Sequence, residues 1–263
     1  MSKKYEELDF TDDFFFCKIL IKNKQLCKEL LELILQIKIQ KIVFSAEQKP
    51  IEITADGKGV RLDVYVEDDA NTVYDIEMQP TVKNNLPKRS RYYQGMIDLN
   101  LIERGANYKE LKKSFIIFIC LSDPFDKGLH VYTFENFCRE CPELKLGDET
   151  SKVFINASGT ANDVSKEMKA FLDYFQGKGI KSDFVRRIDD EVKQARVHEE
   201  WKVEYMSLFL RDQDKIEEGR EEKLHSIVIN MLKENMSIDI ICRVAECDET
   251  YVKKIQEELE TNQ

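Results

Sequence analysis

The chain has 263 residues, of which 42% are hydrophobic and 34% are charged, and its formal net charge is −10. This length suits one large domain, or one medium domain with a helical appendage. The acidic balance argues against a nucleic acid partner, because phosphate binding usually leaves a basic footprint, and no apolar run approaches the ~20 residues that span a bilayer. Seven cysteines, an odd number, and a start without an apolar leader lead us to expect a cytoplasmic protein.

The acidity is uneven along the chain. Residues 83–91 hold four basic side chains and no acidic one, and a second basic cluster lies at 109–113. Much of the negative charge gathers instead at 217–222 and 257–260. The objection to a nucleic acid partner is therefore weaker for the first half of the chain.

The first elements in chain order are two helices and a set of strands. Thr11 or Asp12 would cap a helix through 14–18, and apolar spacing predicts a second helix over 24–35. Two short strands and a turn are then expected at 38–46, 51–54 and 56–59. Residues 61–79 alternate strictly between apolar and polar side chains, which predicts a two-stranded hairpin that turns within 68–71.

The elements after the hairpin complete a mixed pattern. Pro80 and Pro87 would bracket a loop, and a helix over 88–104 would end at Gly105 as its C-cap. The continuous apolar run 114–121 predicts a strand buried on both faces, followed by short strands at 129–134 and 152–156. From residue 163 the pattern is helical, with expected helices at 164–175, 184–211, 215–233, 237–244 and 249–259. The order predicts an α/β domain over 1–160, with a mixed sheet flanked by helices, and an all-helical C-terminal region over 161–263.

The predicted hairpin places acidic side chains on one face. Leu62, Val64 and Val66 point one way on the first strand, and Asp63 points the other. If Asp63 lies across from Glu77, then Leu62 lies across from Met78, and the loop has three residues, 69–71. Like charges placed across a strand pair are destabilising, and a cation between them would remove the penalty. The alternative is the ordinary solvated face of an edge hairpin, and spacing alone does not decide between the two.

A metal site of this kind would suit phosphodiester hydrolysis. That reaction needs a hard cation, and Mg²⁺ prefers carboxylate oxygens while it retains several waters, so two protein carboxylates are enough. Asp63 and Glu77 would supply them, and the backbone carbonyl of Met78 would be a third ligand. Gln79, on the same face as Glu77, could orient the attacking water but cannot accept its proton.

Several segments around the hairpin form an ordered set: 10–16, 61–66, 74–79, 89–93, 105–111 running into 114–121, 204–208 and 218–222. This set resembles one branch of the PD-(D/E)XK nuclease superfamily, the recombination-promoting nuclease / putative transposase family, and covers most of residues 9–222. The resemblance implies a restriction-endonuclease-like fold and a Mg²⁺-dependent DNA endonuclease, in which Mn²⁺ may substitute, linked to recombination, mobile elements or defence. Low sequence specificity is expected, since nothing supplies base readout.

The resemblance also implies roles for residues of the hairpin. Asp63 and Glu77 would be the metal ligands, and Gln79 would stand where the motif usually has a lysine. The chain departs from the motif at two positions. Leu62 replaces the proline before Asp63, and Gln79 removes the cationic group that would stabilise the phosphorane. These departures leave open a catalytically silent relative that binds nucleic acid or a protein partner. A nuclease that acts on RNA is a third possibility.

Other residues could support the site. Arg89, Tyr92 and Tyr93 share a helix face, so with Lys88 and Arg91 they could contact DNA. The alternative is that both tyrosines pack on the sheet and Arg89 pairs with a carboxylate. Two further residues, Asp13 and Glu32, could each add a carboxylate at the metal, although capping and a solvated face are the expected roles.

Two features lie outside the hairpin. Cys138 and Cys141 form a CxxC pair that could bind zinc together with Cys242 and Cys247, but free thiols are expected. Residues 235–259 are similar to a helix-turn-helix unit whose second helix has an acidic remainder, so oligomerisation or packing is expected there. A homo-oligomer through the C-terminal helices would follow.

Overall fold

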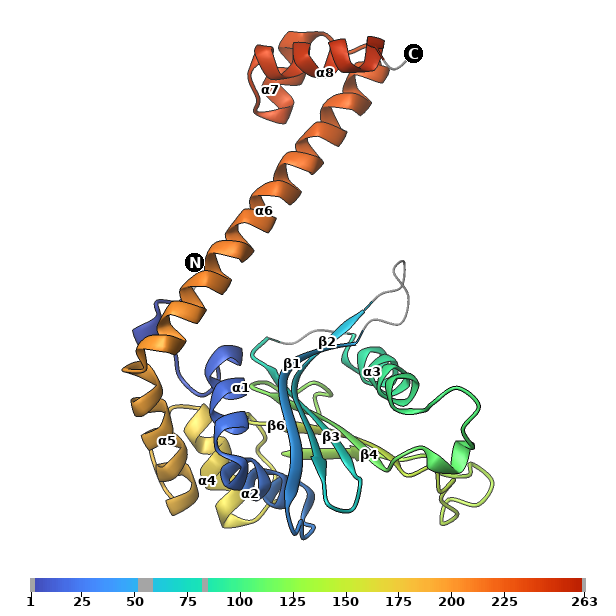
Figure 1. Ribbon diagram of the computed structural model, residues 1–263, viewed down its shortest axis with the longest axis vertical. Coiled ribbons are helices and arrows are strands. Elements are labelled where there is room, and N and C mark those ends of the chain that lie inside the picture. Colours follow the sequence, from blue (N-terminus) through green and yellow to red (C-terminus); the bar gives the residue numbers. More distant parts are fainter. Residues whose placement is uncertain (1–2, 52–58, 82–84, 262–263) are drawn as a thin grey trace. The chain divides into compact units, whose positions relative to one another are not determined.

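The computed structural model describes residues 3–51, 59–81 and 85–261 of the chain (Figure 1). It divides into two compact units, Met1–His198 and Glu199–Gln263. The turn expected at 56–59 and most of the strand expected at 51–54 lie outside the described residues. No helix in the described part of the chain is both long enough and apolar enough to cross a bilayer.

A six-stranded mixed sheet in the order β1-β2-β3-β4-β6-β5 forms the centre of the first unit. Its strands are β1 (Ile42–Ile51), β2 (Val60–Asp68), β3 (Val73–Gln79), β4 (Ser114–Cys120), β5 (Val131–Phe134) and β6 (Thr150–Asn156). Strands β1, β2 and β3 are antiparallel, β3, β4 and β6 are parallel, and β5 closes the edge antiparallel to β6. Every residue of β4 is buried, as its continuous apolar run predicts. The predicted α/β class and mixed sheet are confirmed.

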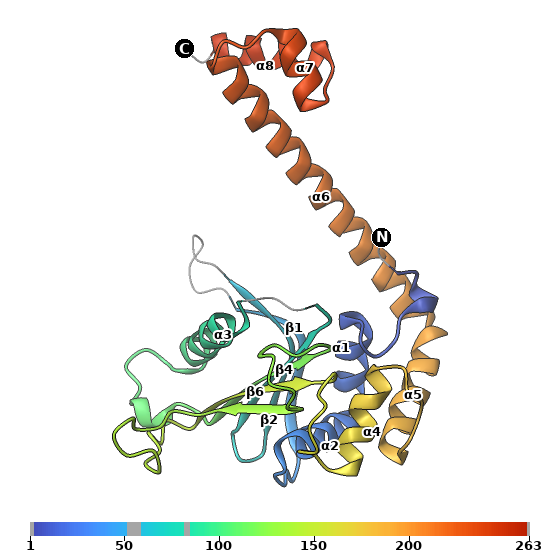
Figure 2. The ribbon, with the colours of Figure 1, turned by 180° about the vertical axis from the view of Figure 1, so that it is seen from behind.

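Helices cover both faces of this sheet, as Figures 1 and 2 show from opposite sides. One face carries α1 (Asp13–Lys22), α2 (Lys24–Leu35), α4 (Lys166–Phe175) and α5 (Asp183–Arg196). The other face carries α3 (Leu86–Leu101), which packs against β4 and β1. One-turn helices lie at Tyr5–Glu7 and Tyr108–Glu110. The two layers bury β3 from both sides, which is why polar side chains on this strand are shielded from water.

Three sequence expectations in this unit are wrong in detail. The strand expected at 38–46 does not end there: β1 begins at Ile42 and continues to Ile51, through Gln48 although the φ of that residue is +48°. Pro87 does not bracket a loop but lies in the first turn of α3, where its missing N–H would be unpaired anyway. The same helix ends at Leu101, and Gly105, at φ +87°, lies beyond it.

The helical boundaries near residue 198 also differ from expectation. No break occurs at 212–214; instead α5 ends at Arg196 and α6 runs unbroken over Glu199–Lys233. The Tyr5 hydroxyl donates to the carbonyl oxygens of Ala195 (2.6 Å) and His198 (3.2 Å) at the junction of the two helices, where the His198 N–H also donates to Ala195 (3.0 Å) in a tighter turn. Since α4 and α5 pack with α1 and α2, the compact unit extends to His198, whereas residue 160 lies just past the end of the sheet.

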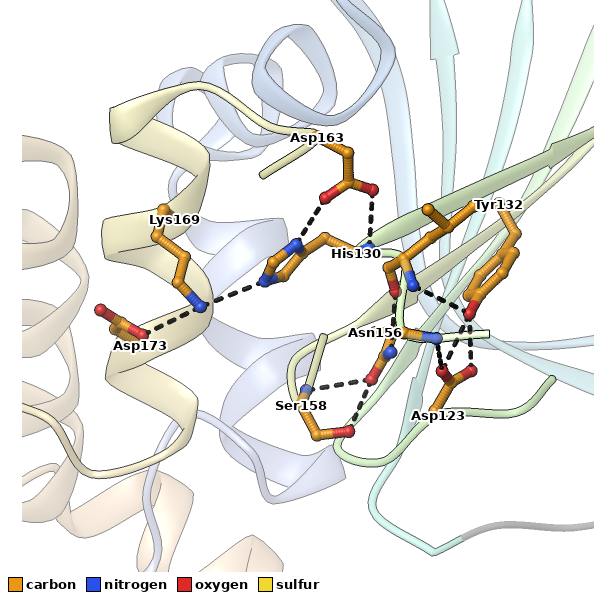
Figure 3. Close-up of polar contacts among 10 residues, drawn as sticks. Asp123, His130, Tyr132, Asn156, Ser158, Asp163, Lys169 and Asp173 are labelled. Carbon is orange, nitrogen blue, oxygen red and sulfur yellow. Dashed lines mark hydrogen bonds and ion pairs between the residues drawn. The ribbon is translucent and has the colours of Figure 1, made fainter. Parts of the chain in front are cut away.

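A polar network fixes the loops that follow β4 and β6 (Figure 3). His130, whose ring is buried, has its Nδ1 2.6 Å from Asp163 Oδ1 and its Nε2 3.1 Å from Lys169 Nζ on α4. Asn156, at the end of β6, donates from Nδ2 to the carbonyl of Leu129. A Cβ at Gly159 would lie 2.7 Å from the His130 ring, so the loop after β6 can approach only as glycine.

The second unit, in its described residues, consists of three helices: α6, α7 (Ile238–Ala245) and α8 (Glu249–Thr261). Val228, Ile241, Val252 and Ile255 form its buried core. A three-residue connection joins α7 to α8 and starts with Glu246 in the left-handed region at φ +53°. Both short helices expected here are present.

Candidate active site

The hairpin of β2 and β3 has the predicted register. Val64 pairs with Ile76 and Val66 with Tyr74, and the paired residues end at Val64, the neighbour of Asp63. A hydrogen bond of 3.1 Å from Asp68 N–H to the Thr72 carbonyl closes a loop of three residues, 69–71. Asn71 occupies the left-handed position of this loop at φ +63°. The alternation of side chains therefore predicts the register of the paired residues, and this register continued by one residue would oppose Asp63 to Glu77.

The acidic face of β3 is buried, not solvated. Glu77 is 0% exposed and Gln79 is 4% exposed, while Asp63 on β2 is half-buried. The Asp63 backbone N–H donates to Glu77 Oε1 (2.9 Å), and Met78 N–H donates to Asp63 Oδ2 (3.2 Å). The reading of this face as an ordinary solvated sheet edge is wrong, because α3 covers it.

Asp75 is a third carboxyl group at the site, and it was missed by the sequence analysis. It lies two residues before Glu77, so the two side chains share one face of β3. Its side chain is completely buried, and neither carboxyl oxygen makes a hydrogen bond of regular geometry. The signal was present in the sequence, since Asp75, Glu77 and Gln79 recur at every second residue.

Crowding of the carboxyl groups shifts their pKa values upward. Burial, with the charge of Asp13, raises the pKa of Asp63 to about 6. Burial, with the charge of Asp63, raises the pKa of Glu77 to about 8. The pKa of Asp75 rises well above its usual range, first through burial and then through the charges of Glu77 and Asp63. Such shifts mark a place where the chain concentrates negative charge.

The two additional carboxylates considered from the sequence behave differently. Asp13 lies in the first turn of α1, after the N-cap Asp12, and its charge reaches Asp63. Glu32 accepts a hydrogen bond from the Ile39 backbone N–H (2.9 Å) and so fixes the chain between α2 and β1. Only Asp13 therefore acts on the acidic site.

Arg89 of α3 points into the site. Its guanidinium donates from Nη2 to Glu77 Oε2 (2.5 Å), from Nη1 to Gln79 Oε1 (2.8 Å) and from Nε to the Tyr93 hydroxyl (2.8 Å). Its Cζ also lies 5.3 Å from the centre of the Phe118 ring. The pairing of Arg89 with a carboxylate, which was the alternative to a contact with DNA, is the arrangement in this structure.

The other α3 residues expected at DNA divide between two sides of the helix. Tyr93 is 8% exposed and packs against Phe118, with 6.2 Å between the ring centres. Tyr92 is 40% exposed, and Lys88 and Arg91 are exposed as well. The two tyrosines thus lie on different sides of α3. The outer side of the helix exposes two basic residues, Lys88 and Arg91, together with Tyr92.

Gln79 has both ends of its amide engaged. Oε1 accepts from Arg89, and Nε2 donates to the Thr81 carbonyl (2.9 Å). The amide is therefore held in one orientation by two partners. In this arrangement the Gln79 Oε1 atom is directed at Arg89.

A family model described as PD-(D/E)XK nuclease family transposase matches residues 10–172. The chain belongs to this family. The matched segment runs from just before α1 into α4 and contains every residue of the site described above. No curated protein and no solved structure gives a significant match. Membership of the family supports a nuclease or mobile-element function, with DNA as the substrate and a divalent metal as the usual cofactor of its nucleases.

The donor set of this nuclease-family site fits a divalent cation. Asp63, Asp75 and Glu77 face a single guanidinium, which leaves two negative charges in excess when all are ionised. Asp63 Oδ1 and both oxygens of Asp75 make no regular hydrogen bond within the described residues, and oxygen atoms are the donors that Mg²⁺ prefers. No group of three His, Cys, Asp or Glu side chains in the described segments, including these three carboxyl groups, is arranged to hold a metal ion together. Two of the carboxylates would therefore bind the ion, and water and backbone oxygen would complete the coordination.

The cysteines are free thiols, as expected. Cys138 and Cys141 lie near acidic side chains, with their Sγ atoms 3.5 Å from Glu140 Oε2 and 3.1 Å from Glu143 Oε1. Cys242 and Cys247 belong to the second unit. The two cysteine pairs therefore belong to different units, and no group of three or more His, Cys, Asp or Glu side chains that could hold a metal ion is found in the described residues.

Proposed function

We propose that the protein is a Mg²⁺-dependent endonuclease that hydrolyses DNA phosphodiester bonds with low sequence preference. The observation that carries the proposal is the pair of neighbouring carboxyl groups of Asp63, which is half-buried, and Glu77, which is fully buried, within the segment that matches a nuclease family. Isolated buried carboxylates are unfavourable, so a chain that buries two of them and half-buries a third beside one arginine has a use for their charge.

Asp63 and Glu77 would hold the ion, with the backbone carbonyl of Met78 as a third ligand and Mn²⁺ as a possible substitute. The bound ion would supply the charge neutralisation and water activation that phosphodiester hydrolysis requires. The exposed Lys88, Arg91 and Tyr92 of α3 would bind the DNA backbone. Contacts to phosphate fix the position of a duplex and carry no sequence information, which accounts for a low sequence preference.

The setting that follows is recombination, movement of mobile elements or defence against foreign DNA. Seven free thiols suit the reducing cytosol expected from the sequence. For α6, we propose self-association through Val203, Met206 and Leu210, which are exposed and spaced three and four residues apart along the helix.

A plasmid-nicking assay tests the nuclease function. The wild-type protein with Mg²⁺ is expected to convert supercoiled plasmid to nicked circles, and EDTA is expected to stop the conversion. Asp63→Asn keeps the size of the side chain and its acceptor for Met78 N–H but removes the charge, so it is the matched inactive variant. Identical nicking by wild type and Asp63→Asn would mean that a contaminant cleaves the plasmid, and RNA offered in competition would reveal a ribonuclease.

A catalytically silent protein that binds nucleic acid or a protein partner is the second candidate. The ion pair between Arg89 and Glu77 favours it, because the guanidinium occupies one oxygen of an expected metal ligand. Binding of labelled DNA without any cleavage at millimolar Mg²⁺ or Mn²⁺ would select this candidate.

A further inference from the structure

We propose that Arg89 supplies the positive charge at the scissile phosphate that the motif lysine would otherwise supply, and that Gln79 positions it. The inference rests on the proposed nuclease function. It changes the role expected for Gln79, from orienting a water to holding a guanidinium.

The first argument is the way in which Arg89 is held. Three of its nitrogens donate to three different acceptors, on Glu77, Gln79 and Tyr93, with distances of 2.5 to 2.8 Å. Its guanidinium also lies 4.9 Å and 5.3 Å from the ring centres of Tyr93 and Phe118. A planar, bidentate group with this many partners has a fixed position, unlike a surface arginine. The structure has therefore built a cation into the acidic site from α3.

The second argument is the chemistry of Gln79. Its Oε1 accepts from Arg89 and its Nε2 donates to the Thr81 carbonyl, so the amide offers an acceptor where the guanidinium needs one. A lysine at this position would place an ammonium next to the guanidinium, and two like charges there repel each other. The departure from the motif and the arginine on α3 thus form one arrangement, in which a single cation serves the site.

The third argument concerns the other basic residues near the hairpin. Lys112 pairs with Glu67 of β2 (2.7 Å), and Lys18 pairs with Glu47 of β1 (2.6 Å). Arg61 acts on Asp63 through its charge but is exposed. The charge of Arg89, in contrast, reaches Asp63, Asp75 and Glu77 together.

In this role the guanidinium stays in place, and only one of its nitrogens exchanges a carboxylate partner for the phosphate. Nη2 would exchange Glu77 Oε2 for a nonbridging phosphoryl oxygen, while Nη1 and Nε keep Gln79 and Tyr93. Arginine binds both groups with the same planar geometry, and its donors would then meet the charge that develops on the phosphoryl oxygens. Arg89 neither gives up nor takes a proton in this role.

The test compares kcat and KM for nicking by Arg89→Ala, Gln79→Lys and the double variant Gln79→Lys/Arg89→Ala. Arg89→Ala is expected to lower kcat by about 100-fold or more with little change in KM, as for the loss of other transition-state donors. The double variant is expected to regain at least about tenfold in kcat over Arg89→Ala, since the introduced ammonium returns the charge from the motif position. Gln79→Lys alone is expected to be slower than wild type. Lys112→Ala, which removes an equal charge that is paired with Glu67 outside the carboxyl cluster, is the matched control and is expected to keep its kcat.

A second measurement does not depend on activity. Thermal unfolding of the four proteins of the Arg89–Gln79 cycle in EDTA is expected to show that the two substitutions are not additive, because each removes the same hydrogen bond. Additive effects in that cycle, a wild-type kcat for Arg89→Ala, or a double variant no faster than Arg89→Ala would each overturn the inference. Inactive wild-type protein would instead overturn the nuclease function, on which the inference depends.

Discussion

The backbone N–H of Asp63 donates to Glu77 Oε1 at 2.9 Å, and the carboxylate of Asp63 accepts from the N–H that follows Glu77. Each carboxylate is thus anchored by the strand that carries the other. This reciprocal pairing holds the two carboxyl groups close together in the absence of any ion. Their closeness disfavours the ionised form of both groups. The stability of the folded chain and the occupancy of the site are consequently linked, and that link can be measured.

The first prediction is a stability that falls as the pH rises in EDTA. Carboxyl groups whose folded pKa is raised bind more protons in the folded chain than in the unfolded one. Glu77, with a pKa of about 8, and Asp63, with a pKa of about 6, therefore stabilise the protein fully below pH 4 and lose that contribution between pH 4 and pH 8. Glu77→Gln is expected to flatten this part of the curve. If the melting temperatures of wild type and Glu77→Gln change in parallel between pH 5 and pH 8, the assignment of this pH dependence to Glu77 is contradicted.

The second prediction concerns the ion itself. Because Mg²⁺ or Mn²⁺ would neutralise the excess charge of the carboxyl groups, millimolar amounts are expected to raise the melting temperature of the wild-type protein at pH 7.5. Asp63→Asn is expected to lose this response, while Glu32→Gln, which removes a carboxylate outside the site, is expected to retain it. Equal shifts for all three proteins would show that the ions bind elsewhere.

The sequence predicted those features that depend on local periodicity. Helix α2 has the predicted bounds, and the register of the hairpin follows from the alternation around Asp63 and Glu77. The features that it did not predict depend on contacts between distant segments. The end of α5 is contacted by Tyr5, 190 residues before Ala195, and the inward direction of Arg89 is set by acceptors on β3. Asp75 is a third case. The alternation of the sequence places it on the same face as Glu77, but its burial depends on α3, whose position over this face the sequence did not predict.

The third prediction concerns acid stability far from the site. Hydrogen bonding with Lys181 and then Lys178, together with the charge of Lys169, lowers the pKa of Asp173 to about 2. A carboxyl group with a lowered pKa stabilises the protein above its ordinary pKa, and the contribution is lost as the pH falls toward 2. Asp173→Asn is therefore expected to melt at a lower temperature than wild type at pH 6, and the difference is expected to shrink by pH 3. A difference that is constant between those pH values would point to packing and not to charge.

The fourth prediction tests the loop network around His130. Gly159→Ala would put a Cβ 2.7 Å from the His130 ring and 2.9 Å from the Leu129 carbonyl, so the protein is expected to lose about 1–3 kcal/mol of unfolding free energy. Gly95→Ala is the matched control, because a Cβ there meets no atom within 4 Å. Since alanine favours the helical conformation of α3, the free energy of unfolding is expected to increase by roughly 0.5–1 kcal/mol. Urea titration of both variants measures the two changes, and equal effects would mean that the approach of the loop to His130 is unimportant.

The fifth prediction concerns the outer surface of α3. Arg91 is exposed and, unlike Arg89, has no hydrogen bond to the carboxyl cluster, so Arg91→Ala is expected to weaken DNA binding equally for unrelated sequences. If Arg91 contacts one phosphate, the slope of log K against log salt is expected to decrease by about 1. Fluorescence anisotropy with two duplexes of unrelated sequence, over a range of salt concentrations, measures both effects. Arg104→Ala, which removes an exposed arginine beyond the end of α3, is the control. An unchanged slope for Arg91→Ala, or a loss confined to one duplex, would exclude this helix surface as a general phosphate contact.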